Sequence, residues 1–467
     1  MKIEEVLGSK ISNVIGDNIT NLKAGLKVPS INDFKNEYSE KNHLVFDEAE
    51  RPNKQIKNSL GAVERLEKVN RIGLAFQKRI VKSTVAFTFG NPVLLNCQPI
   101  GDTQTKILAA IKKILADNKV NSLNRKIAKD LARCTQVAEI WYPEQLNESH
   151  ESYGFSTKVK LKSMILSPLK GDELYPFFNE YGDMVAFSRA YNVKNGDKDI
   201  PYFSTYTDEE VIVWKKEGAD WNEESKKPHT LGKIPVVFAS QEEVEWSEVQ
   251  TLIDRLEKLL SNFADINDYH AAPILFVEGG IEGFAKKGDA SAVMVGEKGS
   301  TAEYLSWKNA PDAVKLEIET LIRFIYSFTQ TPDISFDSVK GLNQISGITL
   351  KMLFLDAHLK VMEKREIFDD YLQRRINILK AYLSSLNTTW KAESNKIEIV
   401  PEIKPFMVDD LKYMIDNLLN ASGNQPLISR KTAMGLLGLV DSVDQEIAQI
   451  SKEEQQAAAL QNFPPAL

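Results

Sequence analysis

The sequence predicts an α+β protein that is mainly helical and has an antiparallel β region in its middle third. Three segments carry apolar residues at steps of three and four, and the last of them, 348–386, contains no proline or glycine. Such patterns are typical of long helices. Between about 136 and 238, short runs rich in β-branched and aromatic residues alternate with Asn, Gly, Asp and Pro, which indicates hairpins.

The bulk composition is that of an ordinary soluble protein with two to four domains. The chain has 467 residues, of which 43% are apolar and 26% charged, and its formal net charge is −7. This charge excludes a protein that grips nucleic acid by its overall electrostatic attraction. It still allows DNA to pass through a space whose walls hold it weakly.

The cellular compartment is predicted from what the sequence contains and lacks. Cys97 and Cys134 are the two cysteines, which argues against a disulfide framework and favours a reducing compartment. The first residues lack the apolar core of a signal peptide. No apolar run approaches the roughly 20 residues that cross a bilayer. We therefore expect a chain without membrane contact that is soluble and cytoplasmic at synthesis.

The first third of the chain is predicted to be an arm followed by helices. The first sixty residues are polar and irregular in pattern, with a short helical start, and 32–58 is rich in charge. We expect a surface arm there, or a segment that becomes ordered on a partner. Apolar spacing from 61 to 89 predicts one amphipathic helix, which ends where glycine and proline follow. Two more helices are expected at 105–117 and 120–134.

The middle third is predicted to be a mostly antiparallel sheet. Turn sequences such as Asn195-Gly-Asp197 separate its strands. The expected strands are 136–142, 156–166, 184–193, 202–206, 210–215 and 233–238.

The last part returns to helix. One apolar stripe begins at Trp246 and ends at Ile266, and a second such segment runs from Pro311 to about Gln330. A polar loop separates the second segment from the long helix that follows. From Pro405 the chain is helical again, with an interruption near 423–426.

Catalytic chemistry has no positive support in the sequence. No phosphate-binding loop is present, and the five histidines are never paired at helical spacing. Asp333, Asp337 and Lys340 resemble a metal-dependent nuclease pattern, but the second acid lies three residues before the lysine, whereas the usual pattern has it two residues before. We therefore expect no catalytic residue, no metal ligand and no cofactor.

Four stretches, taken in order, resemble one family. They are 70–92, which ends in Phe89-Gly-Asn-Pro92; the turn and strand 229–238; the helix from Val249 that leads to Pro273-Ile-Leu-Phe-Val-Glu-Gly279; and the loop from Gln330-Thr-Pro-Asp333 to Ser346-Gly-Ile-Thr-Leu-Lys351. In this order the chain resembles the portal proteins of tailed bacteriophages, in the branch common among siphophages. The resemblance covers about 60–455, and 428–446 is similar to that family's last helices.

The resemblance implies a ring of copies, a dodecamer in virions, built of wing, stem, clip and crown. It divides the chain into an N-terminal arm at 1–60, a wing at 61–245, stem helices at 246–270 and 311–330, a clip at 271–310, a tunnel loop at 331–346, a long wing helix and connection at 347–404, and a crown at 405–467. The arm matches least well, so its role stays open. From the residues alone, the stem helices could equally pack within the chain as an ordinary bundle.

Three groups of residues are candidates for function under this resemblance. A channel wall of like charge would repel phosphates and let a duplex slide, and the acidic candidates are Asp254, Glu257, Asp265, Asp268, Glu317 and Glu319. The tunnel loop would contact DNA independently of base sequence through Asp337, Ser338, Lys340, Gly341, Asn343 and Gln344. The clip would dock a motor or adaptor through Lys286, Lys287 and Lys298, although these lysines could equally be solubilising charges.

The sequence therefore predicts a non-enzymatic portal subunit that forms the channel at one capsid vertex for packaging and ejection of double-stranded DNA. The partners that the resemblance implies are further copies of the chain, the terminase large subunit, head-tail adaptors, and the major capsid and scaffolding proteins. Two alternatives remain at this stage: a metal-dependent DNA-processing enzyme, and a structural adaptor of a non-viral assembly.

Overall fold

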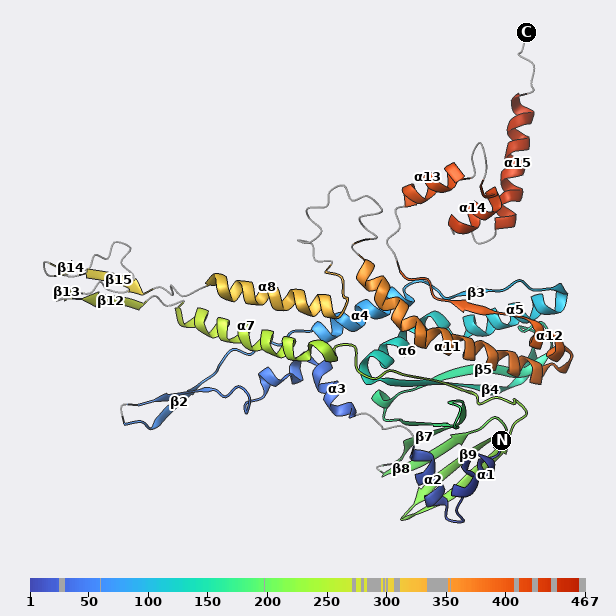
Figure 1. The fold of residues 1–467 in the computed structure, drawn as a ribbon, viewed down its shortest axis with the longest axis horizontal. Coiled ribbons are helices and arrows are strands. Elements are labelled where there is room, and N and C mark those ends of the chain that lie inside the picture. Colours follow the sequence, from blue (N-terminus) through green and yellow to red (C-terminus); the bar gives the residue numbers. More distant parts are fainter. Residues whose placement is uncertain are drawn as a thin grey trace, which may run out of the picture. The chain divides into compact units, whose positions relative to one another are not determined.

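The computed structural model of the chain is shown in Figure 1. It describes residues 1–24, 30–58, 60–196, 198–270, 274–278, 281–283, 295–296, 299, 301–305, 311–333, 352, 354–406, 411–421, 427–437 and 443–461. Two compact units are formed, Met1–Asp333 with Asp356–Phe406, and Ile334–Leu355 with Met407–Leu467. Helices and sheets occur together, and every strand pair in the described residues is antiparallel, which confirms the α+β class.

A three-stranded sheet in the order β11-β4-β5 forms the centre of the first unit. Its strands are β4 (Gln136–His150), β5 (Thr157–Leu166) and β11 (Val236–Ser240). The long helix α11 (Leu355–Leu386) is fixed to β4 by a buried ion pair, in which Arg375 Nη2 lies 2.6 Å from Glu139 Oε2. Tyr371 Oη donates to the same carboxylate. Because both charged side chains are almost fully buried, this pairing is necessary for burial of α11 on the sheet.

Two helices were predicted closely from their apolar spacing. They are α5 (Gly101–Asp117) and α6 (Val120–Cys134). Ile107, Ile111 and Ile114 of α5 are fully buried, as expected for one apolar face at steps of three and four. The prediction at 120–134 is confirmed, and that at 105–117 is confirmed with an earlier start.

A second sheet has five strands in the order β10-β9-β8-β7-β6. Its strands are β6 (Glu173–Phe178), β7 (Met184–Asn195), β8 (Lys198–Tyr206), β9 (Glu210–Glu217) and β10 (Asp220–Pro228). The prediction included β7, β8 and β9 but missed β6 and β10. Strand β10 has only exposed or half-buried residues, so it lacks the apolar alternation that identifies a strand.

The short helical start predicted for the arm at 1–60 is confirmed. Helices α1 (Ile3–Leu7) and α2 (Ile15–Lys23) pack on the five-stranded sheet. Ile3, Leu22 and Phe203 belong to one buried cluster there. These helices are too short to show several turns of apolar repeat, and their stability comes from this packing.

The predicted helix at 61–89 is half wrong. Helix α4 covers only Phe76–Phe89, and the residues before it form a hairpin of β1 (Lys54–Lys57) and β2 (Val63–Glu67). Helix α3 (Ile31–Tyr38) precedes the hairpin. The apolar residues Val63 and Leu66 mimic a helical step of three, yet they are exposed strand residues.

The predicted pair of helices before and after the clip segment is confirmed as α7 (Gln250–His270) and α8 (Pro311–Phe328). Small two-stranded sheets lie between them in sequence: β12 (Ile274–Glu278) with β15 (Thr301–Leu305), and β13 (Ile281–Gly283) with β14 (Val295–Gly296). In Figure 1 the two helices run side by side, with the small sheets at their far end.

Shorter elements complete the two units. In the first unit β3 (Leu94–Asn96) pairs with β16 (Val400–Glu402), and α12 (Lys391–Lys396) follows α11. The second unit contains α13 (Leu411–Ala421), α14 (Arg430–Leu437) and α15 (Val443–Gln461). These helices agree with the predicted helical C-terminal segment, whose predicted interruption at 423–426 lies outside the described residues. Among the described residues, no helix combines the length and apolar character needed to span a membrane.

Candidate functional site

The helices α7 and α8 are joined by a continuous apolar core. Ile253, Leu256 and Ile325 have no exposed surface, and Leu252, Leu260 and Leu321 pack against them. On α7 these positions recur at steps of three and four, so they lie on one face of the helix. The core extends to Trp246 and to Ile80 of α4. The base of the helix pair is therefore anchored within one chain, as in an ordinary bundle.

An extended segment at 70–74, here called the strap, covers a second face of α7. The backbone N–H of Asn70 donates to Asp265 Oδ1 at 2.7 Å. The N–H of Ile72 donates to Ser261 Oγ at 2.9 Å, and that of Leu74 to Glu257 Oε1 at 2.7 Å. The strap thus runs antiparallel to α7, and its backbone donors are satisfied by helix side chains instead of a neighbouring strand.

The regular spacing of these bonds follows from the geometry of the two elements. Two residues of extended chain advance about 6.6 Å, and four residues of α-helix advance about 6 Å. Every second N–H of the strap therefore meets every fourth side chain of α7. The α7 residues that bind the strap are Glu257, Ser261 and Asp265. Each lies five residues after one of the apolar residues Leu252, Leu256 and Leu260, which corresponds to a rotation of about 140° around the helix axis. Helix α7 is consequently held between α8 and the strap.

A buried ion pair fixes one end of the strap. His43 Nδ1 lies 2.6 Å from Glu257 Oε1, and both side chains are 1% exposed. The other ring nitrogen of His43 lies 2.7 Å from the carbonyl oxygen of Glu37. Burial acts to lower the pKa of His43, but the hydrogen bond and charge of Glu257 outweigh it, and the pKa is raised. Both ring nitrogens face acceptors, which suits the protonated imidazolium.

The other end of the strap is fixed by Arg51. Its guanidinium donates to Asp265 Oδ2 at 2.7 Å and to Asn262 Oδ1 at 2.6 Å. Its Nε donates to the carbonyl oxygen of Asn70 at 2.9 Å. The Asn70 side chain in turn donates to Asp268 Oδ2 at 2.6 Å. One arginine therefore joins the strap and the helix.

The structure corrects part of the predicted acidic channel lining. Glu257 has no exposed surface, and the Asp265 side chain is only 11% exposed. Both carboxylates accept bonds from the strap, as does the more exposed Asp268. Asp254 is half-buried; burial raises its pKa, and Gln250 donates to it. Polar residues on this face of α7 therefore bind another segment of the same chain.

The predicted acids of α8 lie at the surface. Glu317 Oε1 accepts from Arg255 Nη2 at 2.7 Å, which joins α8 to α7. Glu319 lies 3.8 Å from Lys315 on the same helix. Because both pairs are well exposed, they contribute little to stability. These two positions remain available to face a solvent-filled channel.

One side of α8 carries an exposed apolar strip, here called the α8 strip. It comprises Leu316, Thr320, Phe324 and Phe328, which follow at steps of four. Leu316 is 65% exposed, Phe324 39% and Phe328 54%. The two phenylalanine rings stack with centroids 5.5 Å apart. Large apolar side chains in a row on an exposed helix face indicate a contact surface.

The end of α8 is held to the start of α11. Lys360 Nζ donates to the carbonyl oxygen of Thr329 at 2.8 Å and pairs with Glu245 Oε1 at 2.8 Å. Lys364 lies 3.2 Å from the other oxygen of Glu245. Gln330 has a positive φ of 49°, so the helix ends sharply here. The chain thus enters the segment of the predicted tunnel loop from a fixed point.

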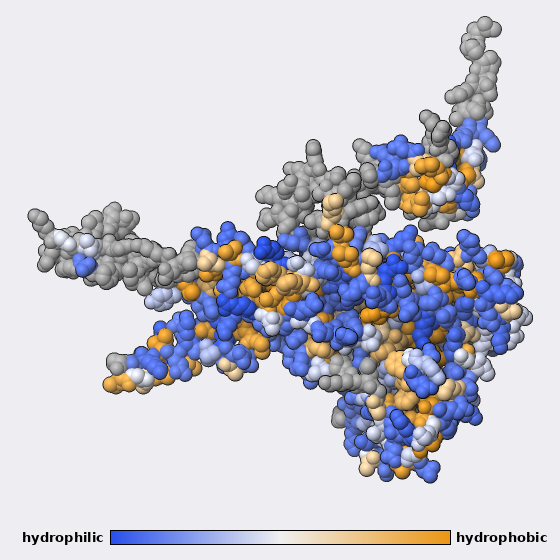
Figure 2. Space-filling view, in the orientation of Figure 1, coloured by the Kyte–Doolittle hydropathy of each residue, from blue (hydrophilic) through white to orange (hydrophobic). Residues whose placement is uncertain are grey.

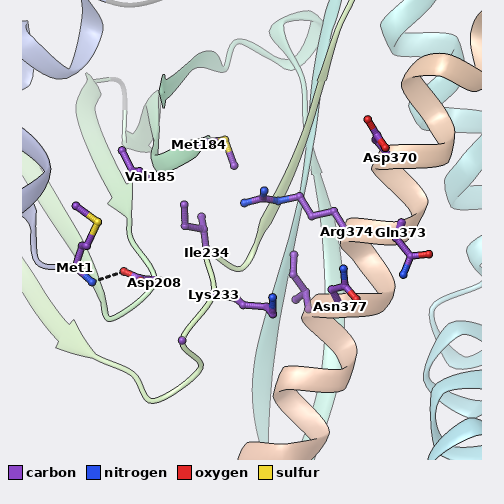
Figure 3. A pocket seen from close by; sticks show the side chains of 12 residues that line it. Met1, Met184, Val185, Asp208, Lys233, Ile234, Asp370, Gln373, Arg374 and Asn377 are labelled. Carbon is purple, nitrogen blue, oxygen red and sulfur yellow. Dashed lines mark hydrogen bonds and ion pairs between the residues drawn. The ribbon is translucent and has the colours of Figure 1, made fainter. Parts of the chain in front are cut away.

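A pocket of about 510 Å³ lies between α11 and the five-stranded sheet. Figure 3 shows Arg374 pointing from α11 across this pocket towards Ile234. Its Nε donates to the carbonyl oxygen of Val236 at 3.2 Å. On another side of the pocket, the amino group of Met1 pairs with Asp208. The lining contains both basic and acidic groups, so it does not select one charge of ligand.

Several predicted site residues lie outside the described residues. They are the tunnel-loop candidates Asp337, Ser338, Lys340, Gly341, Asn343 and Gln344, and the clip candidates Lys286, Lys287 and Lys298. Asp333, at the edge of the described part, is exposed. Within the part of the chain that the structure describes, no three His, Cys, Asp or Glu side chains are grouped so that they could hold a metal ion.

The sequence analysis missed His43 and Arg51 as partners of α7. His43 lies 214 positions from Glu257, and no local pattern connects the two residues. One available signal was the presence of Glu257, Ser261 and Asp265 at steps of four on a face next to the apolar stripe. The sequence pattern instead led us to expect Glu257 and Asp265 in a channel wall.

The solved structures that match the chain include chains of gene transfer agent particles. A chain in the neck of an empty particle, with C6 symmetry, is 12% identical; the match covers 79% of this chain and 90% of that chain, with a TM-score of 0.43. For the neck of a native particle with C12 symmetry the identity is 12%, the coverage 79% and 89%, and the TM-score 0.41. No curated protein matches the sequence.

A family model gives the assignment. The model described as "Phage portal protein, SPP1 Gp6-like" matches residues 25–459, which is most of the chain. The match begins earlier than the sequence resemblance, which starts at about residue 60. It includes α3, the strap, α7, α8 and α11. The chain belongs to the SPP1 Gp6-like family of phage portal proteins.

Proposed function

We propose that the protein forms a ring of identical copies at one vertex of a phage capsid, and that double-stranded DNA enters and leaves through its central channel. Family membership carries this proposal. A portal of this kind acts as a structural conduit without catalysing a reaction, so the family assignment favours the conduit over a DNA-processing enzyme. It equally disfavours an adaptor of a non-viral assembly.

The helix pair α7 and α8 supports ring formation. Its base is buried within the chain, yet the α8 strip stays uncovered. Covering Leu316, Phe324 and Phe328 would remove apolar surface from water, at about 25 cal/mol per Å². Identical copies that contact one another through two different patches form a closed ring when the rotation between them closes. We propose a dodecamer.

The passage of DNA would involve the predicted tunnel loop and the exposed acids of α8. In this proposal Lys340, Asn343 and Gln344 contact phosphates transiently, while Glu317 and Glu319 belong to a channel wall that repels them. The clip, with Lys286, Lys287 and Lys298, would dock the terminase large subunit during packaging and head-tail adaptors afterwards. The wing would contact the major capsid and scaffolding proteins.

The particle mass of the purified protein tests this proposal. We expect mass photometry to show a single large species of about twelve chains, and negative-stain images to show a ring with a central hole. The double variant Leu316→Glu and Phe324→Glu should shift the species towards monomer. The matched control Val193→Glu changes an apolar residue of comparable exposure, 42%, on β7 and should leave the ring intact.

Two results would contradict the proposal. The first is a wild-type protein that stays monomeric at all concentrations. The second is a closed globule that shows no aperture in the images.

A further inference from the structure

The hairpin β1–β2 lies apart from any sheet. All five residues of β2 are exposed, and three of the four of β1 are exposed as well. Leu60 near its turn is 91% exposed, Val63 50% and Leu66 64%. Figure 1 shows the hairpin projecting from the body beside α7, and Figure 2 shows hydrophobic residues at its tip. A lone two-stranded hairpin is only marginally stable in water, so a cover would stabilise it.

The strand register places the apolar residues on one face. Gln55 pairs with Leu66, and Lys57 pairs with Val63. Cross-strand partners share a face, and so do residues two apart on one strand. The register shifts between Ile56 and Lys57, so Val63 and Leu66 lie on the same side of the hairpin although they are three positions apart. This hairpin face has an apolar centre and a basic edge at Lys57.

The α8 strip has the matching chemistry. Leu316, Phe324 and Phe328 form a row of exposed residues along a helix, and the acid Glu319 lies three positions after Leu316. The charges are also opposite overall. The hairpin and its flank, 54–68, contain four basic and two acidic residues, whereas 311–333 contains four acidic and two basic residues.

The two surfaces cannot meet within one chain, because α7 separates them. Helix α8 packs on the face of Leu252, Leu256 and Leu260, while the strap that follows the hairpin binds the face about 140° away. In Figure 1 α8 and the hairpin accordingly lie on opposite sides of α7. Two complementary patches on opposite sides of one subunit are the requirement for a head-to-tail contact that repeats around a ring.

We propose that the hairpin β1–β2 of each copy packs its Val63 and Leu66 face on the α8 strip of the neighbouring copy. The inference rests on the proposed ring. It assigns the hairpin as a clasp between subunits and explains why two apolar surfaces of one chain stay uncovered. The strap then has a second role, because it holds the clasp at a fixed position along α7.

Disulfide cross-linking in the assembled ring tests this contact. Leu66→Cys is combined in turn with Leu316→Cys, Phe324→Cys or Phe328→Cys, in a background in which the half-buried Cys97 is replaced by serine. The remaining Cys134 is fully buried. After oxidation, we expect at least one pair to give a ladder of covalent oligomers on non-reducing gels, which reducing agent abolishes. Each single variant should give no ladder beyond dimer.

A matched pair controls for random collision. Val193→Cys replaces Leu66→Cys in combination with the same strip positions; Val193 is exposed near the end of a different strand pair, β7–β8. This control should give no ladder. Coexpression of Leu66→Cys chains with differently tagged Phe324→Cys chains should give a disulfide between the two tags, which shows that the bond joins neighbours.

The outcomes separate this inference from the proposed function. An intact ring in mass photometry without a ladder for any hairpin and strip pair would overturn the clasp and leave the ring standing. A ladder for the control pair as strong as for the hairpin pairs would also overturn it. Absence of a ring in the wild-type protein would overturn the proposed function itself, and the clasp with it.

Discussion

At the scale of single residues, the buried contact with His43 explains how the polar residue Glu257 can bind the strap inside the protein. Glu257 accepts the strap N–H of Leu74 and the imidazole of His43, and neither side chain reaches solvent. A buried carboxylate without a partner is costly, so the pair is needed for the strap to close on α7. Protonation of His43 is therefore coupled to the stability of this region.

Replacing His43 by asparagine should give a pH-dependent loss of stability. The folded pKa of His43 is raised above its ordinary value of 6.5. The stabilisation is therefore fully present below pH 6.5 and is lost as the pH rises through the folded pKa. We expect His43→Asn to lower the unfolding free energy by about 3 kcal/mol at pH 6, and by less at alkaline pH. Urea denaturation between pH 5.5 and 9.5 measures this difference.

His229 provides the control for this titration. Burial lowers the pKa of His229, so its contribution has the opposite sign and is lost as the pH falls. His229→Asn should leave the alkaline loss of stability in place. A destabilisation by His43→Asn that is equal at every pH would show that the imidazole acts only by packing.

At the scale of elements, the strap and α7 form a unit with a simple test. Ser261→Ala removes the acceptor of the Ile72 N–H. An unpaired backbone donor costs about 1–3 kcal/mol when it is buried. We expect faster amide hydrogen exchange at 70–74 in Ser261→Ala, measured by mass spectrometry, with little change in the five-stranded sheet. Thr251→Ala, on the exposed side of α7, should leave exchange of the strap unchanged. Equal exchange in the two variants would rule out the proposed role of Ser261.

The elements that the sequence predicted well are those with a complete local signal. Helices α6 and α7 each show several turns of apolar repeat, and their packing uses that stripe. Residues 61–75 were predicted to be helical because Val63 and Leu66 are three apart. In the structure Val63 and Leu66 belong to one of two paired strands instead, and the N–H of Asn58 donates to the carbonyl oxygen of Ala62 between these strands. Both conformations suit this spacing locally, and the contacts of the strap with α7 favour the extended one.

The candidate site could be predicted only where the sequence pattern and the residues that make the contact belong to the same helix. The apolar stripe of α7 was identified because it repeats along the sequence. The role of Glu257 and Asp265 could not be predicted, since their partners come from 43–74, which lie 183 to 214 positions earlier. A polar row on a helix has the same appearance in sequence whether water or another segment covers it.

At the scale of the whole molecule, the proposed conduit predicts a separation between assembly and DNA retention. Replacing Lys340, Asn343 and Gln344 by alanine should leave the ring intact, because ring contacts are assigned to α8 and the hairpin. It should impair packaging or retention of DNA, measured as nuclease-protected DNA per particle. The control Lys194→Ala with Asn195→Ala changes exposed residues of β7 and should retain normal DNA content. Normal DNA content in the triple variant would show that this loop is not the contact.

The antiparallel course of the strap along α7 has a mechanical consequence. Tension applied to the hairpin along the helix axis would shear the contacts at Glu257, Ser261 and Asp265 together, so they share the load. Tension applied perpendicular to the axis would peel the same contacts off in succession, with a much smaller force. A hairpin held in this way resists sliding between neighbouring subunits. It can still be detached progressively from one end.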